Sequence, residues 1–495
     1  WMQGREGWVA EVLVRQRAME GNFIDLRVAV VGNVDSGKST LVGVLTSGKL
    51  DNGRGFARSM VFRHRHEIET GRTSSITQQI MGITASGDIV NYDTLNTKTS
   101  GEIVKDSSKV VTFIDLAGHE RYIKTTVYGM TGCVPDYTMV VVGANMGVQR
   151  MTKEHLGVAL ALKCAFFFVV TKVDMCPEHV LKNTINELQK IVKAPGIRKI
   201  PVMIRSEADV IAAAKDMANG ARVTPIFLVS NVTGHNLDLL RLWFNSVPSQ
   251  KALGDLINDP AEFYIDDTFS VPGVGTVVGG TMTSGSITLK SNLVIGPDSR
   301  GVFQPIQVKS IMNKSLPVNL VAAGQSATMA VKKLKRSQIR KGMVITEATL
   351  QPKACVRFTA EVIVLHHPTT ITVNYQPVVH SLTVRQACRV VSMDKENIRT
   401  GDRAIVTMEF LFRPEYMVLG ARLIFREGRT KGIGKVVGLH FADGTHKCLE
   451  DDASFKPDMT QSSRQGIRDQ MSSNINDSTD TSASSDDNTH PCETE

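Results

Sequence analysis

The sequence predicts an α/β domain with a doubly wound, mostly parallel sheet, followed by two smaller domains made of β-strands. Over the first half of the chain, apolar runs alternate with helical stretches, as expected for strands covered on both faces of a parallel sheet. After about residue 248, short β-rich runs separated by Gly, Pro and Asn replace this pattern. The length of 495 residues leaves room for roughly two to four domains.

The beginning of the chain predicts a helical extension over residues 1–23. Within it, residues 8–20 mix Val, Leu and Ala with charged residues at roughly helical spacing. The first residue is Trp1, which indicates a fragment or a processed form. No signal peptide is visible at this end.

The α/β domain is expected over residues 24–248. Its first buried strand is Leu26–Val31, and the same signature returns at Val110–Ile114, Tyr137–Val142, Phe166–Thr171 and Pro225–Val229. Helical stretches lie between these strands, for example His155–Leu162 and Val180–Lys193. Right-handed crossovers then produce a doubly wound sheet.

The second half is expected to hold two antiparallel units, over residues 258–349 and 353–440. Their short strands and regularly spaced turn residues are typical of barrels or sandwiches. Residues 452–495 are rich in Ser, Thr, Asp and Asn and have few large apolar residues. We therefore expect a disordered acidic tail there.

Charge and composition narrow the class of protein. The formal net charge is +8, but the residues from 451 onward hold ten acids and three bases, so the rest of the chain is strongly basic. A basic body indicates an anionic partner such as RNA, or simply a soluble protein with a high isoelectric point. No apolar run approaches the length of about 20 residues that a membrane helix needs, so no membrane partner is expected. The seven scattered cysteines form no CxxC pair, which favours reduced thiols and a cytoplasmic protein.

A phosphate-binding loop is predicted directly after the first strand. Residues 32–39 read Gly-Asn-Val-Asp-Ser-Gly-Lys-Ser and fit the P-loop pattern between a strand and a helix. Glycines let the backbone N–H groups face phosphates, Lys38 brings charge to the β- and γ-phosphates, and the Ser39 hydroxyl can ligate Mg²⁺. The predicted loop residues are Gly32, Asn33, Val34, Asp35, Ser36, Gly37, Lys38, Ser39 and Thr40.

Three later segments favour guanine over adenine. Asp115 and Gly118 follow a strand, where the acid can hold a magnesium-bound water and the glycine N–H can meet the γ-phosphate. Thr171, Lys172 and Asp174 follow another strand, and an Asp there can accept the two N–H donors that only guanine offers. Ser230, Asn231 and Val232 end the last strand, where backbone N–H groups can meet the guanine O6. All lie at carboxyl ends of strands, where ligands of such sheets bind.

Over residues 24–440 these motifs resemble the translational GTPases, the superfamily of elongation factor Tu. More narrowly, the chain is similar to the animal family of GTP-binding proteins 1 and 2, through the segments 50–55, 62–64, 71–75, 113–120 and 423–428. The resemblance implies that both β-rich units are barrels. It also implies GTP/GDP and Mg²⁺ as ligands, and the ribosome, tRNA, another RNA or the RNA-decay machinery as partners.

The resemblance also assigns roles near the γ-phosphate. His119 would orient the attacking water, and Asp115 would hold a magnesium-bound water. In the family, a threonine of the switch segment ligates Mg²⁺ in the GTP state. The matching position in this chain is Ser75, and Thr73 is the alternative. In elongation factor Tu, a hydrophobic gate with two wings shields the attacking water. One wing matches Val34 in this chain, and the other matches Ser74, which is polar. Thr171 replaces the Asn of the usual Asn-Lys-x-Asp, which alters one hydrogen bond.

Two functions follow from this resemblance. The first is an enzyme that hydrolyses GTP to GDP and phosphate while carrying RNA, by analogy aminoacyl-tRNA, to the ribosome. With no obvious arginine finger in the chain, we expect slow hydrolysis that ribosomes accelerate. The alternative is a GTP-gated scaffold in ribosome rescue or RNA decay with little intrinsic turnover. The basic run Lys332–Arg336 is either a phosphate contact or a solvated loop face.

Overall fold

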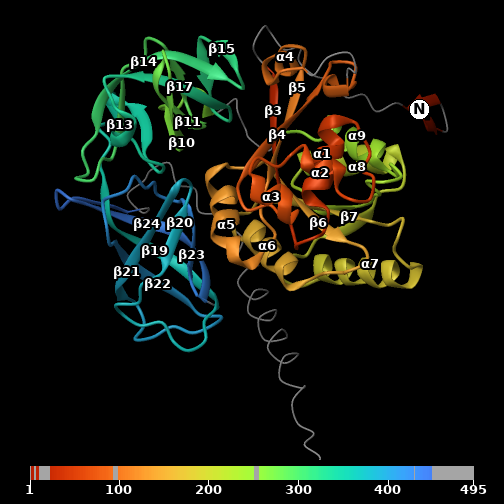
Figure 1. Ribbon diagram of the computed structural model, residues 1–495. Coiled ribbons are helices and arrows are strands. Elements are labelled where there is room, and N and C mark those ends of the chain that lie inside the picture. Colours follow the sequence, from red (N-terminus) through yellow and green to blue (C-terminus); the bar gives the residue numbers. More distant parts are fainter. Residues whose placement is uncertain are drawn as a thin grey trace, which may run out of the picture.

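The computed structural model describes residues 2–4, 7–9, 23–92, 98–249, 256–428 and 430–448. Figure 1 shows an α/β unit on one side and two β-units on the other. Among the described residues, no helix is both long and apolar enough to span a bilayer.

The α/β unit is built on a seven-stranded sheet in the order β4-β5-β3-β6-β7-β9-β8. Its strands are β3 (Ile24–Gly32), β4 (Thr77–Ile83), β5 (Lys109–Asp115), β6 (Tyr137–Gly143), β7 (Ala165–Thr171), β8 (Ile200–Met203) and β9 (Val223–Leu228). All neighbouring pairs are parallel except β4–β5. The five strands predicted from apolar runs are all present. The two edge strands, β4 and β8, were not anticipated, because β4 mixes polar and apolar residues and β8 has only four residues.

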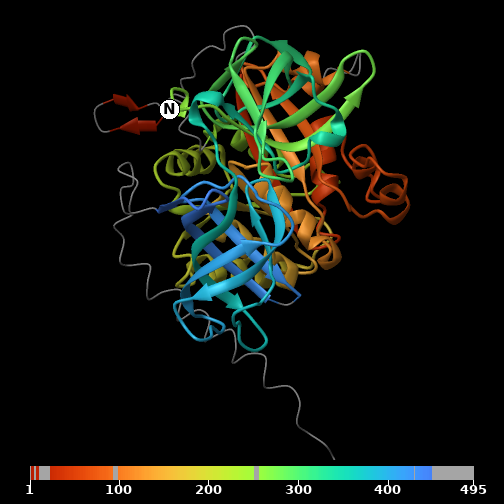
Figure 2. The same ribbon diagram turned by 90° about the vertical axis from the view of Figure 1, so that its left-hand side faces the viewer.

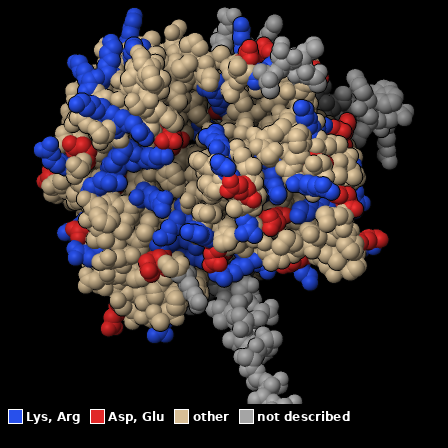
Figure 3. All heavy atoms as spheres, in the orientation of Figure 1, with Lys and Arg blue, Asp and Glu red and all other residues tan. Residues whose placement is uncertain are grey.

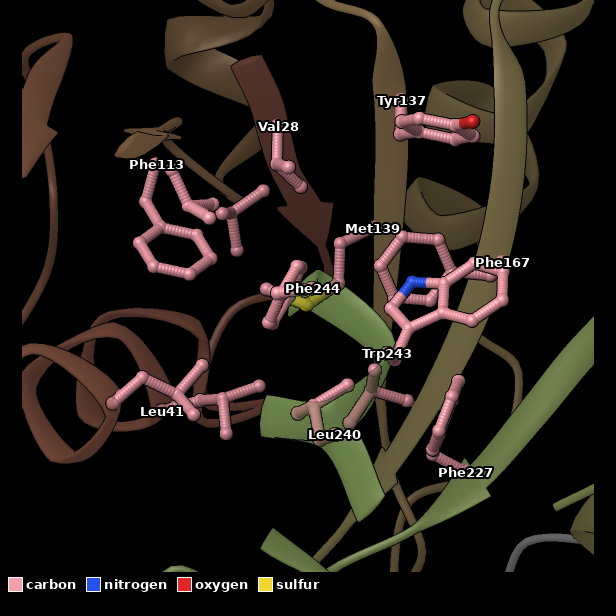
Figure 4. Packing of buried hydrophobic residues seen from close by; sticks show 14 of the residues in the cluster. Val28, Leu41, Phe113, Tyr137, Met139, Phe167, Phe227, Leu240, Trp243 and Phe244 are labelled. Atoms are coloured by element: carbon pink, nitrogen blue, oxygen red, sulfur yellow. The ribbon is translucent and has the colours of Figure 1, made fainter. Parts of the chain in front are cut away.

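Helices cover both faces of this sheet, which confirms the doubly wound arrangement. The α-helices are α1 (Lys38–Ser47), α2 (Phe56–Ser59), α3 (Arg65–Thr70), α4 (Ser100–Lys105), α5 (Ile123–Gly132), α6 (Arg150–Ala161), α7 (Glu178–Lys193), α8 (Glu207–Ala218) and α9 (Leu237–Ser246). Short 3₁₀ turns lie at η1 (Val90–Tyr92) and η2 (Glu120–Tyr122). On one face α1, α8 and α9 enclose a core around Val28, Phe113, Phe167 and Trp243 (Figure 4). On the other face α5, α6 and α7 pack against alternate residues of the same strands.

The second unit closes into a β-barrel. Its strands are β10 (Glu262–Val271), β11 (Gly275–Ser284), β12 (Ser286–Thr288), β13 (Leu293–Gly296), β14 (Gln304–Asn313), β15 (Leu316–Val318), β16 (Leu320–Ala322), β17 (Ser326–Lys332) and β18 (Val344–Glu347), with 3₁₀ turns η3 (Arg336–Gln338) and η4 (Ala348–Leu350). The order β13-β18-β10-β11-β17-β14 closes because β13 also pairs with β14.

The third unit is a closed six-stranded barrel with one added edge strand. Its strands are β19 (Cys355–His366), β20 (Val378–Ser381), β21 (Val384–Met393), β22 (Arg403–Phe410), β23 (Arg422–Glu427), β24 (Thr430–Phe441) and β25 (His446–Cys448). Closure comes from pairing of β19 with β24, and β25 extends the sheet beyond residue 440. Figure 2 shows the two barrels stacked along one side of the α/β unit. The predicted fold class, an α/β domain followed by two barrels, is confirmed.

The helical prediction for residues 1–23 is wrong where the structure describes this segment. Met2–Gly4 and Gly7–Val9 form strands β1 and β2, which pair with Gly4 opposite Gly7. Glycine costs about 1 kcal/mol in a helix interior, so Gly4 and Gly7 disfavour a helix through this segment. Residues 10–22 and the predicted tail at 452–495 lie outside the described residues.

Candidate nucleotide-binding site

The predicted P-loop lies between β3 and α1, at the carboxyl edge of the sheet. Gly37, in the left-handed conformation at φ 84°, precedes α1, and no side chain or acidic residue caps the first turn of that helix. The N–H groups of this turn are therefore available to an anion, and the helix dipole favours negative charge there. Asp35 also has a positive φ, of 58°, so the loop curls around this point.

Lys38 lies inside the loop as a buried cation. Its Nζ donates to the carbonyl oxygen of Asn33 at 2.6 Å, and the same carbonyl accepts a bond from the Ser36 hydroxyl at 2.9 Å. Burial lowers the pKa of Lys38 to about 8, while Asp115 and Asp35 act in the opposite direction. A negatively charged ligand would stabilise the charged form of this lysine.

Three oxygen-bearing side chains meet beside the loop. The Ser39 hydroxyl donates to Asp115 Oδ2 at 2.6 Å and lies 2.7 Å from the hydroxyl of Thr73. The Thr73 hydroxyl also approaches Asp115 Oδ2, at 3.4 Å. Burial raises the pKa of Asp115 to about 6, and its Oδ1 is a buried oxygen without a hydrogen-bond partner among the described residues.

The oxygen atoms of these three side chains are suitable ligands for Mg²⁺, a hard cation that binds carboxylate and hydroxyl oxygens. Ser39 and Asp115 were predicted for this role, and Thr73 is the third member of the group. Ser75, also predicted as a metal ligand, is not brought to it. Its backbone N–H and its hydroxyl both donate to Glu67 Oε1 at 3.0 Å.

Glu67 fixes the segment that contains Ser74 and Ser75. Its fully buried carboxylate also accepts the Ser74 backbone N–H and hydroxyl, both at 2.8 Å. These bonds outweigh burial and lower the pKa of Glu67 to about 2. Ser74 therefore faces Glu67 and is not among the residues lining the phosphate pocket, whereas Val34 is. Of the two expected wings of a hydrophobic gate, only Val34 therefore lines this pocket.

Gly118 and His119 complete this end of the site. A Cβ at Gly118 would lie 2.5 Å from Lys38 Nζ and 2.7 Å from the Gly32 carbonyl oxygen, so only glycine fits. His119 is exposed and lines the same pocket as Lys38 and Ser39. Its Nδ1 accepts the backbone N–H of Arg121 at 3.0 Å, so a neutral ring carries its proton on Nε2.

The predicted base-recognition segments lie together beyond the P-loop. The buried Thr171 hydroxyl donates to the Ser36 carbonyl at 2.7 Å and so ties the β7 loop to the P-loop. Gly37 lies against both Thr171 and Asn231, since a Cβ there would be 3.4 and 3.6 Å from their side chains. Thr171, which replaces the usual Asn, therefore links the end of β7 to the P-loop.

The remaining base-site residues follow from local backbone geometry. Lys172 has a positive φ of 61°, and Asp174 is exposed. The Ser230 hydroxyl accepts the N–H of Val232 at 3.2 Å, which shapes the last loop. The Asn231 side chain is buried, and its Oδ1 has no partner among the described residues.

Sequence reasoning missed two residues that shape this site. Asp51 accepts the N–H of Ala57 at 2.9 Å, and its own N–H donates to the Asn231 carbonyl at 2.9 Å. Arg58, on α2, lines the pocket together with Lys38, Thr73 and His119. An Asp before Asn-Gly is a recognisable turn signal, but nothing local in the sequence directs Arg58 toward the P-loop.

A P-loop at the switch point of a doubly wound sheet, with base-recognition loops beside it and two barrels behind, defines a GTP-binding protein of the translation-factor type. Models of two domain families match the chain: the elongation factor Tu GTP-binding domain over residues 25–251, and the elongation factor Tu C-terminal domain over residues 351–440. The chain belongs to the translational GTPases of the elongation factor Tu type and, within them, to the family of GTP-binding proteins 1 and 2.

Individual relatives support this membership. GTP-binding protein 1 of Xenopus laevis is 52% identical over 436 residues, which cover 88% of this chain and 66% of the relative. GTP-binding protein 2 of Mus musculus is 46% identical over 432 residues, which cover 86% of this chain and 71% of the relative. The chain thus spans about two thirds of these proteins. A similar fold occurs in translation elongation factor SelB from Methanococcus maripaludis in complex with the GTP analogue GppNHp, with a TM-score of 0.59, 17% identity, and coverage of 87% of this chain and 81% of that one.

Proposed function

We propose that the chain binds GTP together with Mg²⁺ and hydrolyses it to GDP and phosphate. The observation that carries this proposal is one pocket, at the carboxyl ends of β3 and β5, lined by Lys38, Ser39, Thr73, Gly118 and His119. A lysine, an uncapped helix N-terminus and hard oxygen donors are what a triphosphate and its magnesium ion need in one place. The match to a GTP-binding domain supports guanine as the base.

In the proposed reaction a water oxygen forms a bond to the γ-phosphorus. The bond from that phosphorus to the β–γ bridging oxygen breaks, GDP leaves with the electron pair, and one proton is released. Lys38 and the N–H groups at the start of α1 hold the phosphates in place and oppose their charge. Bound Mg²⁺ supplies positive charge to the β- and γ-oxygens, and Ser39, Thr73 and Asp115 would hold it, with Ser75 as the sequence-predicted alternative.

His119 is proposed to orient the water. Because its Nδ1 already accepts the Arg121 N–H, the free Nε2 of a neutral ring is a donor, which suits orientation of the water oxygen better than proton abstraction. The ring lines the pocket and is exposed, so a partner such as the ribosome can contact it and move it toward the attacking water.

The first prediction is that His119→Ala leaves GTP affinity nearly unchanged and lowers ribosome-stimulated turnover on the order of 10²-fold or more. Fluorescent-nucleotide titration and phosphate release, with and without ribosomes, measure the two properties. His179→Ala, an exposed histidine on α7, is the matched control and should behave like the parent. Full stimulation of His119→Ala would contradict the role, and GTP binding without turnover in the parent would support the scaffold alternative.

We further propose that the protein binds RNA, by analogy aminoacyl-tRNA, and acts at the ribosome in the cytoplasm. Lys and Arg side chains gather where the barrels meet the α/β unit (Figure 3). A cavity of about 1090 Å³ lies there, lined by Arg63, Lys341, Arg385 and Arg413 and also by a few acids. Such a basic surface suits a phosphate backbone. The Lys332–Arg336 run has four exposed cations and stays a candidate contact.

RNA crosslinking of the GTP-loaded protein, compared with its GDP form, tests this second proposal. We expect crosslinks along the two barrels that weaken in the GDP form, and tighter binding of charged than of uncharged tRNA. Equal crosslinking in both nucleotide states, or none above background, would contradict it. Preference for an RNA other than tRNA would favour rescue or decay.

A further inference from the structure

The phosphate pocket contains a second cation that the P-loop motif does not include. Arg58, on the short helix α2, lines the pocket together with Lys38, Ser39, Thr73 and His119. The side chain is half-buried. In the part of the chain that the structure describes, the Arg58 guanidinium forms no hydrogen bond or ion pair with another residue, and the Arg58 carbonyl oxygen accepts the N–H groups of Val61 and Phe62.

Two glycines hold the guanidinium in a slot. A Cβ at Gly55 would lie 2.3 Å from Arg58 Nε, and a Cβ at Gly71 would lie 2.9 Å from Nη2. Both glycines have a positive φ, of 91° and 66°. Since Gly71 directly precedes the Arg72–Thr73 segment, the slot lies on the Thr73 side of the pocket, where the metal-binding oxygens gather.

The backbone of α2 is anchored from two directions. Asp51 accepts the N–H groups of Gly53, Gly55 and Ala57 at 2.9, 3.2 and 2.9 Å, and its own N–H is bound to the Asn231 carbonyl. On the other side α2 lies against α1 (Figure 1), so closely that a Cβ at Gly43 would be 2.1 Å from the Ala57 carbonyl oxygen. Arg58 therefore starts from a fixed position relative to the P-loop.

From these contacts we infer that Arg58 contacts the γ-phosphate of bound GTP and supplies, from within the chain, positive charge to the transition state of hydrolysis. This inference rests on the proposed GTPase function and revises the expectation that the chain has no arginine finger of its own. Arg58 forms and breaks no covalent bond. Its fork of N–H donors faces the equatorial oxygens on which charge spreads as the γ-phosphoryl group is transferred.

Arg72 also lines the pocket, but its side chain is exposed and no glycine slot holds it. A pre-positioned arginine loses less side-chain entropy when it meets the phosphate, so Arg58 is the better placed of the two. The two arginines predict different results in the same assay.

The test is single-turnover hydrolysis of bound GTP by the full chain, together with binding of GDP and of GDP plus aluminium fluoride, which mimics the transferring phosphoryl group. Arg58→Ala should lower the rate on the order of 10³-fold, the lower end of what a transition-state arginine supplies. It should abolish the fluoride complex and leave GDP affinity unchanged, which also shows that the variant is folded. Arg58→Lys should recover part of the rate, because it keeps the charge but not the fork.

Arg54→Ala is the matched control, since Arg54 is exposed on the same loop and does not line the pocket. An unchanged rate in Arg58→Ala, or an equal loss of GDP and GTP affinity, would overturn the inference. A large loss in Arg72→Ala but not in Arg58→Ala would also overturn it. A parent protein that binds GTP but does not hydrolyse it would instead defeat the proposed function, which separates the two failures.

Discussion

At the residue scale, the candidate site brings together buried groups of opposite charge that an ordinary core would exclude. Lys38 and Asp115 are both buried, and burial shifts each pKa toward the neutral form, to about 8 and about 6. Each would regain its charge beside a phosphate or a magnesium ion. The site is therefore built for ligands of high charge.

A second prediction at the residue scale concerns a histidine of the third unit. His380, on β20, is fully buried, and neither ring nitrogen has a hydrogen-bond partner among the described residues. Burial, with Arg385, Arg426 and Lys124 nearby, lowers the pKa of His380 to about 3. The unfolded chain binds this proton near pH 6.5, whereas the folded protein does not, so folding stability should fall as the pH drops from about 6.5 toward 3.

The prediction is that His380→Leu flattens this acid dependence. As the pH falls, the free energy of unfolding of the parent should drop by up to about 1.4 kcal/mol per pH unit because of this residue. The free energy of unfolding of the variant should drop by that much less. Urea unfolding of both proteins between pH 7 and pH 5 measures the difference. His155, whose pKa is also lowered to about 3, continues to contribute in both proteins. Identical slopes would contradict the assignment.

Some residues of the candidate site could be predicted from the sequence, and others could not. The P-loop was predictable because its residues are contiguous and lie between a strand and a helix. The choice between Thr73 and Ser75 was not, because it depends on Glu67, whose carboxylate binds Ser75 and leaves Thr73 beside Ser39. Such contacts depend on how a loop folds back and leave no periodic signal.

At the element scale, the position of α2 depends on the absence of a side chain on α1. Gly43 lies inside α1, where alanine would ordinarily be favoured by about 1 kcal/mol. A Cβ there, however, would lie 2.1 Å from the Ala57 carbonyl oxygen of α2. Gly157, inside α6, has open space around its position instead.

These two glycines therefore predict opposite effects of the same substitution. Gly43→Ala should destabilise the protein by roughly 1–3 kcal/mol, since the two backbones must separate. Gly157→Ala should stabilise it by about 1 kcal/mol. Denaturant unfolding of both variants, followed by GTP hydrolysis, checks this, and Gly43→Ala should also slow hydrolysis because Arg58 moves with α2. A stabilising Gly43→Ala would show that the helices are not in tight contact.

The elements themselves were predictable where their patterns were strong. The central strands of the α/β sheet are nearly continuous apolar runs and were all found. The N-terminal hairpin was missed, because Val and Leu at helical spacing in residues 8–20 carried more weight than Gly4 and Gly7. Whether such a short segment forms strands depends on cross-strand pairing, which the local periodicity of the sequence does not reveal.

At the scale of the whole molecule, polar contacts join the α/β unit to both barrels. Arg27, on β3, is buried and donates to the Thr281 hydroxyl of the second unit at 2.8 Å. Glu154, on α6, pairs with Lys431 of the third unit at 2.6 Å. The next residue, His155, accepts the Gly32 backbone N–H at 3.2 Å, so the contact with the third unit lies one residue from a P-loop hydrogen bond. Barrel position and loop geometry are thus physically connected.

Whether the full chain is a GTPase is decided by comparing GTP, ATP and xanthosine triphosphate as its substrates. Asp174 is exposed, so Asp174→Asn should not disturb folding. The parent should hydrolyse GTP and leave ATP untouched, and Asp174→Asn should transfer that preference to xanthosine triphosphate, whose base presents an oxygen acceptor where guanine presents an amino group. Equal hydrolysis of GTP and ATP by the parent, or an unchanged preference in Asp174→Asn, would contradict the account.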